Sequence, residues 1–363
     1  MARKDVEETP RHWIAVAAIT ALVVGCGTSP TSDPTTPRAS AGPVTSVGNF
    51  PTIPTAALPD ELTSSLRAAV DDPVEVGTFE GVTAAVVVAG QGTWSGAAGV
   101  DEQGAPLSAG SQLLTASVAK TVTAAEVLHL VEGGNLGLDD PAVDHLPRAI
   151  ARFDLHGATI RDLLGMRSGV VDRSDYVAAV NSGAGIVELL EGSTFGSFAP
   201  GSQVDYENVN YVLLGTIVEE ESGRSFWSTL RSGVLDGEEE GFVFPRTGAL
   251  AADGWQVRVD AGSLARWGYE LYGGAVLSDA SLQEMTDFHD DWYGLGAIDF
   301  GHGTPALEAF GVPAIGHGGM EGNDAAMVVA FPDAGVVVAV QARGTSLEAV
   351  AGIARALEVA ATA

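Results

Sequence analysis

The sequence predicts an α/β protein of the α+β type, in which one antiparallel sheet is flanked by helices and joined to a mostly helical lobe. Two apolar hairpins that lie far apart in the chain carry this prediction. The predicted strands are residues 82–88, 93–98, 325–331 and 336–340, with glycine-containing turns at 90–92 and 332–335. Because the segment between the hairpins has mainly helical spacing, we expect strands from both ends of the chain to share one sheet.

Helices are predicted where apolar residues recur every three or four positions. They cover residues 117–132, 210–221, 260–272 and 278–287, and one more follows Ser346. The first ends at Gly133-Gly134, a common stop signal, and Ser346 is a suitable N-cap. We expect the last helix to cover the sheet and the middle ones to form the lobe. Ser117 then lies at the junction of the two parts, where clefts usually form.

The N-terminal segment predicts export. Residues 14–24 form an apolar run that suits a signal-peptide core and is short for a membrane-spanning helix. The run leads into Val-Val-Gly-Cys26, which resembles a bacterial lipobox, and this resemblance implies lipidation of Cys26. Asp5, Glu7 and Glu8 depart from the pattern because they cancel the basic charges of the leader. An uncleaved membrane anchor and a cytosolic protein with an unrelated apolar start are the alternatives.

The chain therefore divides into three parts. We assign residues 1–25 to a lipoprotein signal peptide, 26–58 to a disordered Ser/Thr/Pro-rich tether, and 59–363 to the folded domain. The tether segment has few large apolar residues, so it cannot bury enough surface to offset its ordering entropy. This division predicts a domain secreted across the cytoplasmic membrane and held at its outer face by a lipid.

Composition excludes several classes of function. The net charge is −29, with 18 Lys and Arg against 47 Asp and Glu, which argues against nucleic-acid binding. A single cysteine excludes an internal disulfide framework and a cysteine-rich metal site. The histidines are scattered, and no nucleotide-binding or zinc-protease motif is present. We therefore expect no metal, no cofactor and no nucleic acid, and we expect a monomer that takes a small-molecule or peptide substrate.

Ser117 and Lys120 are the main candidates for chemistry. They lie three residues apart at the start of a predicted helix, so they share a face that continues through Ala124 and Val127. Burial disfavours a charged lysine, and its amine could then take a proton from the Ser117 hydroxyl. A surface serine and lysine on an amphipathic helix is the alternative. On its own, the Ser-x-x-Lys pattern recurs by chance in many chains.

Two further patterns contain polar groups that suit the same chemistry. Tyr206-Glu-Asn208 supplies a phenol that could move a proton and an amide that could orient Lys120 and a substrate carbonyl. His317-Gly318-Gly319 precedes the C-terminal hairpin, and its glycines would let a substrate lie against a strand. A covering loop tyrosine and a hydrogen-bonded core histidine are the structural alternatives.

Together the three motifs resemble the serine β-lactamase and D-Ala-D-Ala carboxypeptidase superfamily, in its class C-like, penicillin-binding-protein and esterase branch. Five other short segments also resemble segments of that family and occur in the same order, at 138–141, 160–164, 168–169, 200–201 and 293–296. The resemblance covers about residues 60–358 and implies a β-lactamase/transpeptidase-like fold.

The resemblance also implies roles for individual residues in an acyl-enzyme mechanism. Ser117 is the nucleophile, Lys120 and Tyr206 share general-base and general-acid work, and Asn208 orients Lys120 and the substrate. The backbone N–H groups of Ser117 and Met320 form the oxyanion hole. His317 replaces a lysine found in many β-lactamases, and it lines the substrate site with Gly318 and Gly319. Which of Lys120 and Tyr206 takes the first proton is left open, because strongly interacting groups titrate as a unit.

One departure from the family bears on the substrate. Relatives that bind penicillin or D-Ala-D-Ala carry a Thr or Ser where this chain has Gly318, and that hydroxyl helps to hold a substrate carboxylate. Arg343 is a possible replacement partner for the carboxylate, with a solvated charge as the alternative. Glu207 is expected to point away from the cleft because adjacent residues face different directions.

The sequence thus leads to three functional hypotheses. The first is a membrane-anchored serine hydrolase acting on a peptide, amide or ester carbonyl, like a D-Ala-D-Ala carboxypeptidase or β-lactamase. The second is an esterase of the same fold without a penicillin-directed role, favoured by Gly318. The third is a non-catalytic scaffold that binds wall fragments, which the intact Ser117, Lys120, Tyr206 and Asn208 argue against.

Overall fold

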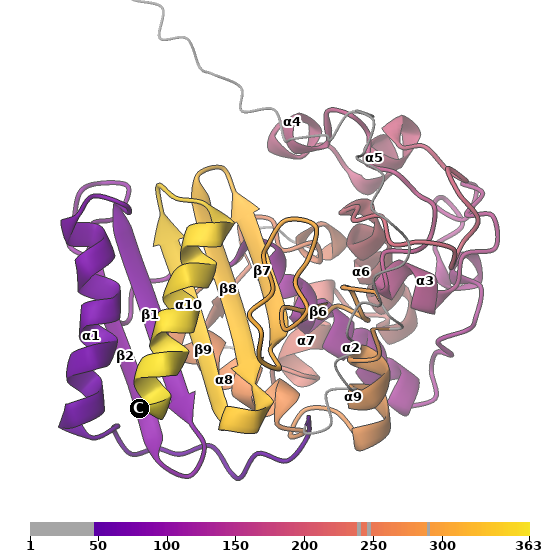
Figure 1. The fold of residues 1–363 in the computed structure, drawn as a ribbon. Helices are drawn as coiled ribbons and strands as arrows, with labels where there is room; N and C mark the ends of the chain where they lie inside the picture. The colour runs from indigo at the N-terminus through magenta and orange to yellow at the C-terminus, as the bar shows by residue number, and fades with distance from the viewer. Residues whose placement is uncertain (1–46, 238–240, 245–247, 289–290) are drawn as a thin grey trace, which may run out of the picture. The chain divides into compact units, whose positions relative to one another are not determined.

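A six-stranded antiparallel sheet forms the centre of the computed structural model, which describes residues 47–237, 241–244, 248–288 and 291–363. The strand order is β2-β1-β9-β8-β7-β6, so the first hairpin pairs directly with the last strand (Figure 1). The strands are β1 Gly81–Val88, β2 Gly92–Gly99, β6 Ile298–Asp299, β7 Ile315–Glu321, β8 Asp324–Phe331 and β9 Val336–Arg343. This confirms the α+β class and the sheet shared by both ends of the chain.

Helices cover both faces of the sheet. Helices α1 (Asp60–Glu75) and α10 (Leu347–Thr362) lie side by side on one face, and α8 (Ala261–Tyr272) lies on the other (Figure 1). The strands β1, β8 and β9 are buried along nearly their whole length. Their sequences are rich in Val and Ala without polar alternation, because helices cover both faces of the sheet. Helix α1 was not predicted, and its Pro73 sits near the C-terminal end.

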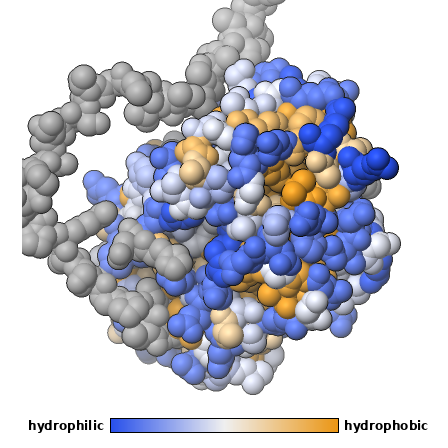
Figure 2. Space-filling view, turned by 90° about the vertical axis from the view of Figure 1, so that its right-hand side faces the viewer, coloured by the Kyte–Doolittle hydropathy of each residue, from blue (hydrophilic) through white to orange (hydrophobic). Residues whose placement is uncertain are grey.

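The middle of the chain forms the expected helical lobe, but α8, which we expected in the lobe, packs on the sheet instead. The helices of the lobe are α2 Lys120–Glu132, α3 Ile160–Leu164, α4 Tyr176–Asn181, α5 Ile186–Gly192, α6 Val209–Ser222, α7 Phe226–Ser232 and α9 Asp279–Met285. A small sheet has the strand order β3 (Leu113–Leu114), β5 (Arg258–Val259) and β4 (Phe242–Val243). Strand β3 comes just before the segment that precedes α2. Figure 2 shows the lobe side, where hydrophilic residues cover most of the surface and hydrophobic residues gather in patches.

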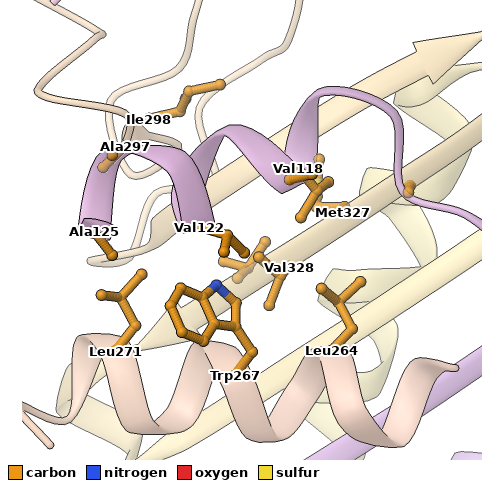
Figure 3. Packing of buried hydrophobic residues seen from close by; sticks show 14 of the residues in the cluster. Val118, Val122, Ala125, Leu264, Trp267, Leu271, Ala297, Ile298, Met327 and Val328 are labelled. Atoms are coloured by element: carbon orange, nitrogen blue, oxygen red, sulfur yellow. The ribbon is translucent and has the colours of Figure 1, made fainter. Parts of the chain in front are cut away.

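Helix α2 is the central element that carries the candidate site. It is buried on all sides over its first nine residues, and it packs against α6, α7 and α8. Figure 3 shows Val122 of α2, Trp267 of α8 and Val328 of β8 packed together. The indole Nε1 of Trp267 donates to Thr121 Oγ1 at 2.9 Å, which satisfies both buried polar groups. The residues at the start of α2 are therefore held by a close-packed core.

The folded domain begins before residue 59, where we had placed its boundary with the tether. Residues 47–58, which we assigned to the tether, contact the domain: Phe50 lies against Tyr269 with ring centroids 4.8 Å apart, and Leu58 is buried. The Tyr269 hydroxyl also donates to Pro51 O. Two large apolar residues explain the difference, because they give this stretch surface to bury. The predicted signal peptide, Cys26 and the rest of the tether lie outside the described residues. Within the described part, no helix is long and apolar enough to span a bilayer.

Candidate active site

Ser117 sits in a short 3-10 turn, η1 (Ala116–Ala119), that runs straight into α2. The residue before it, Ala116, has φ +45°, a left-handed conformation that costs energy for a residue with a Cβ. Gly254 packs against this turn so closely that a Cβ there would lie 2.2 Å from Ala116 O. The surrounding structure therefore fixes the backbone on which the Ser117 side chain is mounted.

Lys120 is fully buried and its amine contacts three oxygen atoms. Nζ lies 2.9 Å from Ser117 Oγ, 2.8 Å from Asn208 Oδ1 and 2.7 Å from Asp253 O. These partners come from η1, from the residue before α6 and from the loop after the 3-10 turn η3 (Gly248–Ala251). The structure thus brings together the first two sequence motifs, which lie 88 residues apart.

The hydrogen bonds of Lys120 allow its amine to take a proton from Ser117. Two of the three partners of Lys120 are carbonyl oxygens, which only accept. A neutral amine has two N–H donors for those carbonyls and one lone pair left, which is directed to the third partner, the Ser117 hydroxyl. In that state the Ser117 hydroxyl donates a hydrogen bond to the Lys120 amine. In the ammonium state Lys120 donates to all three oxygens, so the pair can exist before and after a proton transfer without rearrangement.

Tyr206 lies over the amine of Lys120. The distance from Nζ to the ring centroid is 5.2 Å, and the buried phenol oxygen has no hydrogen-bond partner among the described residues. Trp292 stacks on one side of the ring and Tyr293 meets it edge-on. A buried hydroxyl without a partner is uncommon in a folded protein and marks a place where a ligand atom can bind.

His317 lies behind the site rather than on its surface. It is fully buried, its Nδ1 is 2.8 Å from Gly318 O, and its Nε2 is 3.2 Å from the Tyr293 hydroxyl. Burial, reinforced by the charge of Lys120, lowers the pKa of His317 to about 3. The ring is therefore neutral, with Nδ1–H donating to the carbonyl and Nε2 accepting from Tyr293. In this state it supplies no positive charge in place of a lysine, and it contacts the Tyr206 ring instead.

The two glycines of the third motif face opposite sides of β7. A Cβ at Gly319 would lie 2.4 Å from the backbone N of Ser117, so the strand and η1 are in close contact there. This brings the N–H of Ser117 next to the strand that carries Met320, as the expected oxyanion hole requires. A Cβ at Gly318 would instead meet Leu347 of α10, so a side chain at this position starts away from Ser117.

Carboxylates lie close to the site, and two of them were missed in the sequence. Asp253 is buried; its carboxylate accepts from the Tyr176 hydroxyl at 2.6 Å, while its backbone carbonyl holds Lys120. Asp172 accepts from the backbone N–H groups of Asn208 and Val209. Burial is the main cause that raises the pKa of Asp172 to about 6. A backbone carbonyl can come from any residue type, so the Asp253 contact had no sequence signal.

Two charged residues singled out in the sequence have partners outside the Ser117–Lys120–Asn208 contacts. Glu207 turns toward the Asp172 loop, as expected, and accepts from the N–H of Asp172 at 3.0 Å. Burial raises the pKa of Glu207 to about 7. Arg343 lies at the end of β9, where its guanidinium is 3.5 Å from Glu80 and 3.8 Å from Asp324. It is an ion-paired, mostly buried side chain and not a solvated charge.

Together, the sheet, the helical lobe and the Ser117–Lys120–Asn208 contacts define a β-lactamase-fold protein of the serine hydrolase type. A model of the Beta-lactamase family matches residues 66–362. The chain therefore belongs to the Beta-lactamase family.

Curated relatives and solved structures agree with this assignment. Penicillin-binding protein 4 of Amycolatopsis lactamdurans is 27% identical over 286 residues, which cover 66% of this chain and 74% of the relative. Penicillin-binding protein 4* of Bacillus subtilis is 34% identical over 140 residues, 36% of this chain and only 30% of that protein.

Two solved structures have the same fold. A D-stereospecific amidohydrolase from Streptomyces superimposes with a TM-score of 0.67 at 21% identity, covering 84% of this chain and all of the other. The D-amino acid amidase of Ochrobactrum anthropi gives a TM-score of 0.68 at 18% identity, with 83% and 98% coverage.

Proposed function

We propose that this protein is a serine hydrolase that acts through an acyl-enzyme on a peptide, amide or ester carbonyl. The observation that carries the proposal is the buried amine of Lys120 at 2.9 Å from Ser117 Oγ, with its two remaining contacts made to carbonyl oxygens. This geometry meets the requirement for an activated nucleophile, since the base is within hydrogen-bond reach and is itself oriented by a third group.

The proposed reaction has two stages. Ser117 Oγ attacks the substrate carbonyl carbon while its proton passes to the Lys120–Tyr206 pair, and the oxyanion is held by the N–H groups of Ser117 and Met320. The intermediate collapses by breaking the bond to the leaving nitrogen or oxygen, which takes the proton. Water then adds to the ester, the bond to Ser117 Oγ breaks, and the serine regains a proton. Asn208 orients the amine throughout.

Labelling by a fluorophosphonate probe tests the nucleophile. We expect one covalent adduct per chain, located on Ser117 by peptide mass spectrometry. Ser117→Ala is expected to abolish it, whereas Ser168→Ala, which removes a buried hydroxyl bonded to Asn210 outside the Lys120 contacts, keeps it. An adduct of equal yield on Ser117→Ala would refute the assignment.

A second candidate, an esterase or amidase for substrates without a carboxylate, is supported by the charges around the site. Asp172 interacts electrostatically with both Lys120 and Asp253, and Arg343 is already paired with Glu80 and Asp324. An anionic substrate therefore meets acidic neighbours, and Arg343, the cation that the sequence offered for its carboxylate, is already paired. We expect a p-nitrophenyl ester and a D-amino-acid amide to react faster than nitrocefin or a D-Ala-D-Ala peptide. The reverse order would favour the penicillin-directed carboxypeptidase or β-lactamase.

We further propose that the protein is a secreted monomer anchored through a lipid on Cys26. The apolar run at 14–24 and the residues before Cys26 support this proposal. Mass spectrometry of the mature N-terminus is expected to show a diacylglyceryl-modified Cys26, and an unmodified chain starting at Met1 would rule it out. Light scattering of the soluble domain tests the monomer. A penicillin-binding protein homologue from Pyrococcus abyssi with a similar fold is octameric.

A further inference from the structure

Asn208 does not cap the helix that it precedes. It directly precedes α6, but its backbone is already helical, with φ −64° and ψ −32°, and not in the extended conformation from which an N-cap side chain reaches the first turn. Its side chain makes no capping bond. Its Oδ1 atom lies 2.8 Å from Lys120 Nζ instead. The Asn208 side chain therefore belongs to the candidate site, and the start of α6 needs another acceptor.

Asp172 supplies this acceptor from a distant loop. One carboxylate oxygen accepts the N–H of Val209 at 2.8 Å and the other accepts the N–H of Asn208 at 3.1 Å. A negative charge at a helix N-terminus is also stabilised by the helix dipole. The loop is held in turn, because Glu207 accepts the N–H of Asp172 at 3.0 Å. The backbone of Asn208 is therefore fixed by Asp172 while its side chain serves Lys120.

We propose that Asp172 is a positioning residue for the reaction at Ser117: its ionised carboxylate caps α6 and so keeps the Asn208 amide on the Lys120 amine. When Asp172 is protonated or neutralised, at least one of the two N–H groups loses its acceptor. The backbone of Asn208 is then held less firmly, and its side-chain amide is no longer kept on Lys120. This inference rests on the proposed acylation of Ser117.

The charged groups around Asp172 determine when this happens. Lys120 on α2 favours the ionised carboxylate, while Asp253, in the loop after η3, opposes it. Glu207, which precedes α6, is a further acidic neighbour, and its own carboxyl interacts with Asp172 and Asp205. With burial as the largest cause, the pKa of Asp172 is raised to about 6. The cap is therefore intact at pH 8 and is mostly lost at pH 5.

The test compares acylation rates at several pH values. Single-turnover acylation by a neutral p-nitrophenyl ester is measured for the wild type and Asp172→Asn between pH 5 and 8. At pH 8 we expect the variant to be about tenfold slower, with little change in the concentration at half-saturation, because Asp172 orients Asn208 and does not touch substrate. At pH 5 the ratio of the two rates should approach one, because the wild-type carboxylate is then protonated.

The controls separate this role from a general loss of structure. Asp175→Asn removes an exposed carboxylate in the same loop, bonded to Arg173, and is expected to keep the wild-type rate. Asp172→Glu retains a carboxylate and should recover part of the rate. A purely structural lesion would slow the reaction by the same factor at every pH, and that result would overturn the proposal. If wild type is not acylated at all at pH 8, the proposed function has failed instead.

A measurement on the wild type covers the case in which Asp172→Asn does not fold. The backbone amide resonances of Asn208 and Val209 are followed by NMR between pH 5 and 8. We expect both to titrate with a midpoint near 6, because their acceptor changes its charge there. Amide shifts that stay constant over this range would refute the pH-dependent cap.

Discussion

Replacing Gly319 by alanine is expected to slow acylation of Ser117, whereas the same change at Gly318 should leave it nearly unaffected. The two glycines are neighbours on β7, but their missing side chains point to opposite faces of the strand. At Gly319 a Cβ would lie 2.4 Å from Ser117 N, 3.0 Å from Ser117 Cβ and 3.1 Å from Ala116 Cβ. At Gly318 it would lie 3.0 Å from Leu347 Cδ1 and 3.3 Å from Met327 Cε.

The magnitudes follow from which atoms must move. Ordinary contact requires about 3.4 Å, so the η1 backbone beside Gly319 has to retreat by about 1 Å, and misplacement of a catalytic group by this distance can cost about a hundredfold in rate. The extra methyl should also destabilise the fold by about 1–3 kcal/mol. The contacts at Gly318 are the ends of flexible side chains, which can give way by a few tenths of an ångström. We therefore expect a rate within about twofold of the wild type and less than about 1 kcal/mol of destabilisation.

Stopped-flow acylation with a p-nitrophenyl ester at pH 8, together with urea unfolding, measures both effects. The pair of variants differs by one strand position only, so each is the control for the other. The reasoning is refuted if Gly319→Ala acylates as fast as the wild type. It is equally refuted if Gly318→Ala loses as much activity as Gly319→Ala while remaining folded.

Three further results are expected. Lys120→Met removes the base and should lower the acylation rate by about 10²- to 10⁴-fold while the fold by circular dichroism is kept. Tyr176→Phe deletes the bond to Asp253 and should cost about 1–3 kcal/mol in urea unfolding, with a smaller loss of acylation rate. Glu207→Gln should gain stability relative to the wild type as the pH rises from about 4.5 to about 7. The pKa of Glu207 is raised in the folded state, so the stability of the wild type falls over that window. Because the carboxyl is only part-buried and solvent screens it, we expect a fall of about 1–2 kcal/mol in urea unfolding. A difference between the two proteins that does not change with pH would contradict this explanation.

The main features of the fold could be predicted because they depend on local patterns. Three of the four hairpin strands, β1, β8 and β9, are rich in Val and Ala. The spacing of Ser117 and Lys120 directs both side chains to one region. The helix of residues 347–362 begins after a serine that caps it, as expected. Helix α1 was missed because its apolar residues are few and a proline lies within it.

The contacts that complete the candidate site could not be predicted in the same way. Asp253 holds Lys120 through a backbone carbonyl, which leaves no mark on residue type. Asp172 acts on the start of α6 from 36 residues earlier in the chain, through backbone N–H groups that leave no mark on residue type. The burial of His317 is another case, because its pairing with Tyr293 depends on how the segment after α9 returns to β7. Long-range packing decides these contacts, and a single sequence does not record it.

The setting of Lys120 also bears on the choice between an enzyme and a scaffold. Burying an amine costs free energy unless each of its hydrogen bonds is satisfied, and here three oxygens from three separate segments do so. An apolar residue of similar size would fill the same space without that requirement, and such replacements of buried charged groups are often neutral or stabilising. A scaffold would therefore gain nothing from the lysine, nor from the left-handed backbone at Ala116 beside it. Both features are costs to folding that a reactive Ser117 explains, which is why we favour catalysis over binding alone.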